Sequence, residues 1–309
     1  MTILGVIFPI FALVLVGYLT TYSGLLSARD IQGLSRFVFT IALPVLLFYS
    51  MAHLELPGAF DWQFLFSYYT VLLVIYGLGI WTSKHWFAQT PLEQSLFGMG
   101  SAYSNTLLVG LPIISAGLGQ AALLPLFVLV SIHSAVLFFI VTVLAERGNG
   151  AGHTARQVAV QTLRNLATNP IIIGLVLGLL VRLLAVPIPK PIDDSLALID
   201  RAALPVALFV LGGSLTTYKI AGHFREAWTM VGLKVVLMPL LVWFLAFPVF
   251  HIDPLWGAVA VMTAGMPVGI NAYLFAQKYE TNIATLSTAV LLSTLLTVVA
   301  QSIWLAIFL

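Results

Sequence analysis

The sequence predicts an all-α polytopic membrane protein of ten transmembrane helices, arranged as two inverted five-helix repeats. Three observations predict this fold. The 309 residues are 61% hydrophobic and only 8% charged, with a mean hydropathy of +1.06. Long apolar runs follow one another, and two motifs of the first half return in the second half. Because a soluble domain carries roughly 25% charged residues, lipid is the expected solvent of this chain.

Each apolar run is about as long as a membrane-spanning helix, since roughly 20 apolar residues cross a bilayer core of about 30 Å. The chain has no cysteine, which excludes a disulfide framework and a thiolate metal site, and we expect neither a metal nor a cofactor. Its net charge of +2 does not indicate a nucleic-acid partner. The expected spans are residues 3–22, 32–53, 62–82, 95–118, 121–144, 168–186, 195–217, 228–250, 255–277 and 284–308.

Lysine and arginine are divided unequally between the two sets of loops. Only Arg182 and Lys190 lie near the loops that follow the even-numbered spans. Cytoplasmic loops carry the excess of these residues, so the other face is expected in the cytoplasm and both termini outside. That face carries Arg29, Arg36, Lys84, Arg147, Arg156, Arg164, Lys219, Arg225 and Lys278.

The two halves of the chain contain related motifs. "ALPVLLF" at 42–48 in span 2 returns as "ALPVALF" at 203–209 in span 7, and "GLP" at 110–112 in span 4 returns as "GMP" at 265–267 in span 9. Short apolar strings also recur by chance, but two pairs in equivalent spans favour an internal repeat.

A polar stretch at 146–167 separates the halves, so we expect one repeat at 1–145, a cytoplasmic linker at 146–167 and a second repeat at 168–309. Five spans per half is an odd number, so the second copy enters the membrane from the opposite side. Inverted repeats with interrupted helices in matching positions are typical of secondary transporters.

Spans 4 and 9 carry residues that interrupt a helix. Proline removes a backbone N–H, and in hydrocarbon the freed carbonyl must be buried in protein or face a wet cavity. Each span is therefore expected to form two half-helices, the second starting near Pro112 or Pro267; a simple proline kink is the alternative. The residues concerned are Ser104, Asn105, Thr106, Gly110 and Pro112 in span 4 and Gly265, Met266 and Pro267 in span 9.

Two half-helix N-termini would then converge near the middle of the bilayer. Each carries roughly half a positive charge and unpaired N–H donors, which together make an anion site from the backbone. The amides of Asn105 and Asn271 lie close to the prolines in sequence and could donate to the same anion.

Two ionisable residues inside spans are candidates for a role at the site. Lys234 in span 8 either snorkels to the interface or faces the site, where it could balance substrate charge or couple to protons. His133 in span 5 could titrate at the site or form a hydrogen bond with a neighbouring helix.

At these residues the chain resembles the auxin efflux carrier superfamily, which includes plant PIN proteins and bacterial carriers for malonate or malate. "NTLLVGLP" at 105–112 is similar to the family's first crossover motif, and "MPVGINAYLFAQKYETNIATLSTAV" at 266–290 to its second. The short central loop, with Val268 and Asn271 in place of the residues usual in plant carriers, favours the bacterial branch and hence a bacterial inner (plasma) membrane.

The resemblance implies a fold similar to sodium/proton antiporters and bile-acid transporters. Spans 1, 2, 6 and 7 would form a scaffold, and spans 3–5 and 8–10 a moving transport unit that works as an elevator. Crossed broken spans 4 and 9 would hold a small carboxylate at Asn105, Pro112 and Pro267, and His133 falls where plant members place a polar substrate-contacting residue. A homodimer through spans 2 and 7 would supply a fixed scaffold.

Three other functions compete with a carboxylate carrier. A passive channel predicts a continuous polar stripe, whereas the polar residues are concentrated at the breaks. A membrane enzyme needs a compact constellation of acids or histidines, and none is present in the sequence, so no enzymatic activity is expected. A sodium-coupled bile-acid-type symporter shares the implied fold. The coupling ion, a proton or sodium, is left open.

Overall fold

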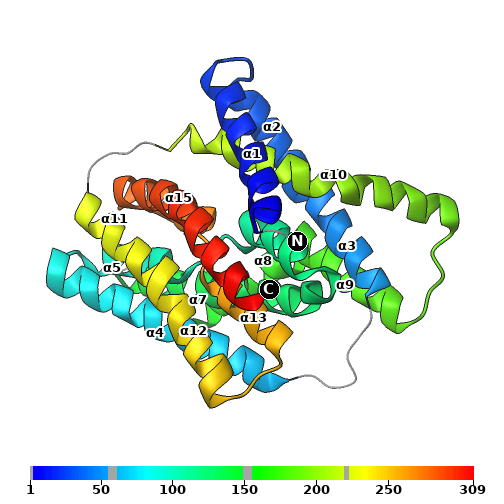
Figure 1. Cartoon of the computed structure of the whole chain (residues 1–309). Coiled ribbons are helices and arrows are strands. Elements are labelled where there is room, and N and C mark those ends of the chain that lie inside the picture. Colours follow the sequence, from blue (N-terminus) through cyan, green and yellow to red (C-terminus); the bar gives the residue numbers. More distant parts are fainter. Residues whose placement is uncertain (1–2, 55–60, 149–154, 219–222) are drawn as a thin grey trace. The chain divides into compact units, whose positions relative to one another are not determined.

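The computed structural model describes residues 3–54, 61–148, 155–218 and 223–309. Lys219 and residues 149–154 of the predicted linker lie outside the described residues. Within the described ranges the chain is helical, with no strand beyond one isolated bridge between Ser104 and Val268 (Figure 1).

The helices follow one another closely along the chain. Several of them are joined end to end by π-helical turns, and we use one label for each segment. In order they are α1 (Ile3–Tyr22), α2 (Ala28–Phe37), η1 (Val38–Ala42), α3 (Leu43–His53), α4 (Trp62–Phe87), α5 (Pro91–Ala102), η2 (Thr106–Gly110), α6 (Leu111–Leu118), η3 (Gln120–Ala122), α7 (Leu123–Gly148), α8 (Ala155–Ala167), α9 (Pro170–Leu183), α10 (Lys190–Leu215), α11 (Phe224–Val231), η4 (Gly232–Leu237), α12 (Met238–Phe244), η5 (Leu245–Val249), α13 (Pro254–Ala264), α14 (Ile270–Lys278) and α15 (Ile283–Phe308).

Seven helical segments of the described chain are long and apolar enough to cross a membrane, or up to eight if the bent pair Arg156–Ala167 and Pro170–Leu183 is one span. This establishes a multi-pass membrane protein, with fewer uninterrupted spans than the ten expected. The difference lies where helices are short or bent: α5 has 12 residues, α13 has 11 and α14 has 9, and the bent pair turns by 64°. An uninterrupted span needs about 20 residues.

Side-chain caps fix where many helices begin. Ser27 and Asp30 form a capping box at α2, and Thr90 and Glu93 form one at α5. Asp61 accepts from the N–H of Gln63 at the start of α4. Such caps satisfy the N–H groups that a helix start leaves without a partner.

The described helices fall into two compact units, the first made of Met1–Ala59 and Leu163–Thr217. In this unit α1 packs along α10, and α3 packs along α9 (Figure 1). Glycine permits both contacts: a Cβ on Gly212 would clash with the Val14 carbonyl, and one on Gly178 would lie 2.9 Å from the Met51 Cβ. Small residues of this kind let membrane helices approach closely.

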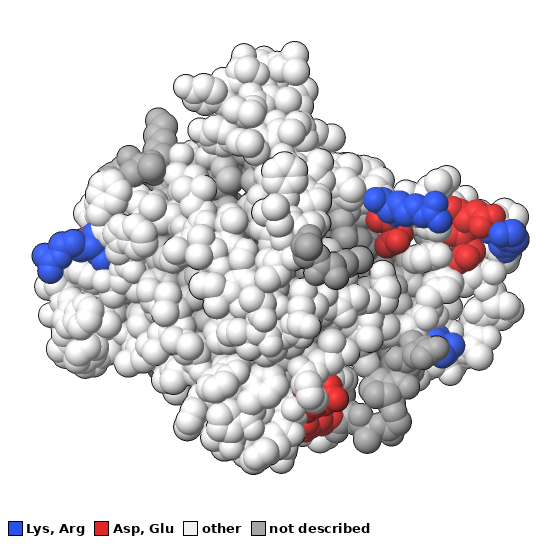
Figure 2. Space-filling model, in the orientation of Figure 1, with Lys and Arg blue, Asp and Glu red and all other residues white. Residues whose placement is uncertain are grey.

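The second unit contains Phe60–Thr162 and Tyr218–Leu309. Here α4 packs against α5, α11 against α15 and α12 against α13, around fully buried aromatic residues such as Tyr68, Phe97 and Phe127. All interrupted segments of spans 4 and 9 belong to this unit. Figure 2 shows charged side chains only in small groups at the margins of the visible face, with uncharged residues over most of it.

Candidate functional site

Two short extended segments interrupt helices in the second unit. The first is Tyr103–Asn105, between the end of α5 at Ala102 and the start of η2 at Thr106. The second runs from Gly265 to Gly269, between the end of α13 at Ala264 and the start of α14 at Ile270. We call them the first break and the second break. They lie in predicted spans 4 and 9, so the interruptions expected there are present.

The two breaks pair with each other as an antiparallel β-bridge between Ser104 and Val268. The N–H of Asn105 donates to the Pro267 carbonyl at 2.9 Å, and the N–H of Gly269 donates to the Tyr103 carbonyl at 2.8 Å. Ser104 and Val268 are both buried. Backbone groups that the breaks take out of helices are therefore satisfied across the bridge, as a membrane interior requires.

The second half-helix of span 4 begins six residues earlier than the sequence predicted, at Thr106 and not near Pro112. The physical reason is the π-helical turn η2. Its last hydrogen bond joins the N–H of Leu111 to the Thr106 carbonyl, so the missing N–H of Pro112 falls just after the turn, at the start of α6. In span 9, Pro267 lies inside the break, and α14 begins three residues later at Ile270.

Neither helix that starts at a break has a side-chain cap. Asn105 and Gly269 are the N-cap residues of η2 and α14, and neither helix start has a side-chain cap hydrogen bond within the described part of the chain. By contrast, the first halves of the same two spans begin under caps from Thr90 and Asp253. The uncapped starts lie on the two sides of one bridge and leave N–H donors of the first turn for another acceptor.

Polar side chains surround the first break. The N–H of Ser104 donates to His133 Nε2 at 3.1 Å, and the Tyr68 hydroxyl lies 3.5 Å from the Ser104 hydroxyl. The Asn271 amide donates to the Tyr103 hydroxyl at 2.7 Å, so α14 reaches back to the first break. His133 is 2% exposed and Asn105 is 7% exposed, and the Asn105 side-chain amide forms no hydrogen bond within the described part of the chain.

The second break is held by α15. The N–H of Val268 donates to the Ser293 hydroxyl at 3.0 Å, and the Gln301 amide donates to the Met262 carbonyl at 3.1 Å. The sequence did not point to Ser293 and Gln301 as site residues, nor to Tyr103 and Tyr68. The available signal was the spacing of Ser293, Thr297 and Gln301, which places three polar residues on one face of an otherwise apolar helix.

Lys234 lies in η4 and is completely buried, which excludes snorkelling to an interface. Its ammonium donates to the carbonyl of Ala264, the last residue of α13, and lies 3.6 Å from the Met238 sulfur. It therefore contacts the C-terminal end of a half-helix beside the second break, not the two uncapped helix starts.

The remaining predicted residues lie at varying distances from the bridge. Gly110 faces the second break, since a Cβ there would lie 3.3 Å from the Met266 Cγ. The Thr106 hydroxyl donates to the Ser104 carbonyl at 3.1 Å and so stays within its own segment. Pro112 is buried in the first turn of α6.

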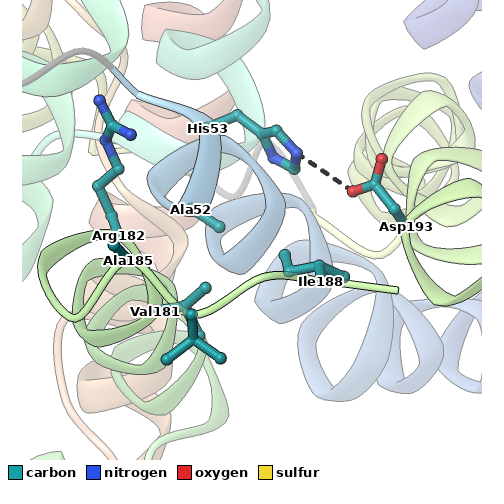
Figure 3. Close-up of a pocket in the computed structure, with 8 residues that line it drawn as sticks. Ala52, His53, Val181, Arg182, Ala185, Ile188 and Asp193 are labelled. Atoms are coloured by element: carbon teal, nitrogen blue, oxygen red, sulfur yellow. Dashed lines mark ion pairs between the residues drawn. The ribbon is translucent and has the colours of Figure 1, made fainter. Parts of the chain in front are cut away.

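A pocket of about 310 Å³ lies in the first unit, and none of the predicted site residues lines it. The ends of α3 and α9 and the start of α10 line it (Figure 3). The His53 ring points toward the Asp193 carboxylate, 3.1 Å from Nε2 to Oδ1, and both side chains are partly exposed. Arg182 also lines this pocket. The side chains of the His53–Asp193 pair are partly exposed, whereas Ser104 and Val268 at the breaks are buried.

This chain is similar to known proteins over nearly its whole length. The model of one family, described as membrane transport protein, matches residues 2–305. A candidate malonate transporter of Rhizobium meliloti (strain 1021) is 25% identical over 300 residues, which cover 96% of this chain and 92% of the relative. An uncharacterized transporter of Methanothermobacter thermautotrophicus is 23% identical over 304 residues, or 96% of each chain. Auxin efflux carrier component 5 of Arabidopsis thaliana is 21% identical over 330 residues, which cover 92% of this chain and 90% of the relative.

Proposed function

Because the chain belongs to the membrane transport protein family, which is that of the auxin efflux carriers, we propose that it is a secondary transporter of small carboxylate anions. Its substrates would be malonate- or malate-like acids or auxin-like weak acids. The anion would bind where the two breaks meet. The names of two relatives, one for malonate and one for auxin, support the carboxylate class.

One observation carries the proposal: two uncapped helix starts lie on either side of a buried β-bridge. Each supplies the positive end of a helix dipole and first-turn N–H groups, of which those of Thr106 and Ala272 bond to nearby carbonyls; the dipole and the remaining donors stabilise an anion. The Asn105 amide is at the first of these starts, and Asn271 is in the first turn of the second. Discontinuous helices of this kind present their N-termini to anionic substrate groups in other transporters.

Transport would proceed by elevator-like alternating access, with ten spans in two inverted repeats. Support comes from the division of the described chain: the first compact unit contains predicted spans 1, 2, 6 and 7, and the second contains spans 3–5 and 8–10. In this proposal the first unit is the scaffold and forms a homodimer, and the second carries the anion across the inner membrane, with both termini outside.

The test is a thermal-shift screen of the purified protein against small mono- and dicarboxylates and indole-3-acetate, with and without sodium. Wild type is compared with Asn105→Ala. Ser302→Ala serves as the matched control, because among the described residues the Ser302 hydroxyl bonds only to its own helix, at the Val298 carbonyl. We expect one acid to raise the unfolding midpoint of wild type and of the control, but not of Asn105→Ala.

Other outcomes separate the alternatives. Equal stabilisation of wild type and Asn105→Ala by the same acid would show that the anion binds elsewhere. Stabilisation by sodium, with any acid effect appearing only in its presence, would favour the sodium-coupled symporter.

A further inference from the structure

The buried lysine at the second break has an unusual set of neighbours. The Lys234 ammonium is fully buried in the second unit, and among the described residues no carboxylate forms an ion pair with it. Its contacts are the Ala264 carbonyl and the Met238 sulfur. A buried charge is strongly unfavourable unless other groups compensate for it. The oxygen dipole that contacts the ammonium here is the Ala264 carbonyl.

The end of α13 supplies such dipoles. The last carbonyls of a helix carry a partial negative charge, roughly half an electron for the whole helix end. In transporters with broken helices, half-helix C-terminal ends and unwound carbonyls coordinate sodium ions or protons. In this protein the lysine ammonium occupies that kind of position, because it donates to Ala264, the last residue of α13.

Further oxygen atoms lie around the same helix end. Gln301 donates its amide N–H to the Met262 carbonyl, which leaves its Oε1 buried with no hydrogen-bond partner in the described chain. The hydroxyl oxygen of Thr263, in the last turn of α13, is also buried and has no hydrogen-bond partner in the described chain. Neutral carbonyl and hydroxyl oxygens are the ligands that a hard cation takes, and buried ones without partners call for an explanation.

We propose that the Lys234 ammonium is a tethered cation that takes the place of a free sodium ion at the C-terminal end of α13. This inference rests on the proposed function in one respect: the charge of the bound anion is balanced by the ammonium, a group that never leaves the protein. The wild-type carrier consequently has no sodium requirement, and truncation of Lys234 opens a space lined by oxygen atoms that a sodium ion can enter.

The test compares unfolding midpoints in sodium chloride and in choline chloride at equal concentration, without any carboxylate. Wild type is expected to give the same midpoint in both salts. Lys234→Ala, which leaves a cavity, should gain several degrees in sodium chloride only, since a ligand that binds the folded state stabilises it by mass action. Lys234→Met fills the space with an apolar chain and should not respond to sodium. Lys84→Met, at an exposed lysine of α4, controls for loss of one positive charge.

Two results would overturn the proposal: sodium-specific stabilisation of wild type, or equal midpoints of Lys234→Ala in the two salts. Lys234→Ser is the second variant, because it adds an oxygen ligand in the same space. If neither truncation folds in sodium chloride, sodium cannot replace the ammonium and the proposal fails. Because no carboxylate is present, these outcomes do not depend on whether the anion site at Asn105 is correct.

Discussion

The backbone N–H of Asn105 donates to the carbonyl oxygen of Pro267 at 2.9 Å, which joins two helix breaks that lie in opposite halves of the chain. A second hydrogen bond, from Gly269 to Tyr103, completes the bridge. Each break thus supplies hydrogen-bond partners for backbone groups of the other. Moving either helix start would therefore leave buried backbone groups of the other break without a partner. Variants at the bridge should therefore affect stability and anion binding together.

Gly269→Ala should disrupt the bridge by steric overlap. The Gly269 backbone is extended, so alanine meets no conformational strain, but its Cβ would clash with the Tyr103 ring and lie 3.2 Å from the Ser104 carbonyl carbon. Overpacking of this kind destabilises a protein by about 1–3 kcal/mol. We expect a lower unfolding midpoint and loss of carboxylate binding.

The matched control is Gly77→Ala in α4, where an added Cβ meets no atom within 4 Å. Because alanine is the better helix former, this variant should unfold at the wild-type midpoint or slightly above it. Equal midpoints for the two variants would show that the close packing around Gly269 does not constrain the bridge.

Ser293→Ala should destabilise the second break. It removes the acceptor of the buried Val268 N–H, and an unsatisfied buried donor costs about 1–3 kcal/mol. Ser302→Ala on the same helix removes a hydroxyl whose one hydrogen bond within the described chain is to the Val298 carbonyl of that helix, so its effect should be smaller. Chemical denaturation of both variants checks the prediction. It fails if Ser302→Ala is at least as destabilising as Ser293→Ala.

The positions of both breaks could be predicted from the sequence because Gly and Pro carry local information. Proline removes a backbone hydrogen-bond donor and glycine loosens the turn beside it, so interruptions of spans 4 and 9 were expected near these residues. The start of the half-helix at Thr106 could not be predicted, because the π-helical turn that absorbs Pro112 depends on how the Ser104 region pairs with Val268. That pairing is a contact between distant segments.

The residues that the site residues contact could not be predicted from the sequence either. In a helix that is apolar on all sides, no polar face reveals its orientation, so Lys234 could equally have faced lipid headgroups. The contact between His133 and the N–H of Ser104 depends on the same kind of packing. Only the polar spacing on α15 offered a periodic signal, and it indicates a buried face without naming what that face contacts.

His133→Ala should weaken carboxylate binding more than a purely structural change would. Since Nε2 accepts from the Ser104 N–H, a neutral ring carries its proton on Nδ1, and that atom is buried with no partner among the described residues. The Nδ1–H is thus a donor available to a substrate. Alanine removes this donor and leaves the Ser104 N–H unpaired, at about 1–3 kcal/mol.

The measurement compares the unfolding midpoint with the affinity for the acid identified by the thermal-shift screen. His133→Gln, whose amide can accept from Ser104, should recover stability more fully than affinity. His85→Ala, at an exposed histidine of α4, should leave both unchanged. Wild-type affinity in a folded His133→Ala protein would exclude His133 from the anion site.

Glu93 should make the second unit sensitive to acid. Partial burial raises the pKa of this carboxyl, but hydrogen bonds from the Thr90 N–H and hydroxyl, both 2.8 Å, and from the Thr281 hydroxyl outweigh burial and hold the pKa below 4.5. Because the folded-state pKa is depressed, this stabilisation is fully present above pH 4.5 and is lost as the pH falls through the folded-state pKa.

Glutamine at position 93 can still cap α5, but it has no charge to lose. Glu93→Gln should therefore show a smaller fall in unfolding midpoint than wild type when the pH is lowered from neutrality, whereas Glu280→Gln, at an exposed glutamate, should follow the wild-type curve. Parallel curves for wild type and Glu93→Gln would mean that the capping box at α5 contributes nothing to acid sensitivity.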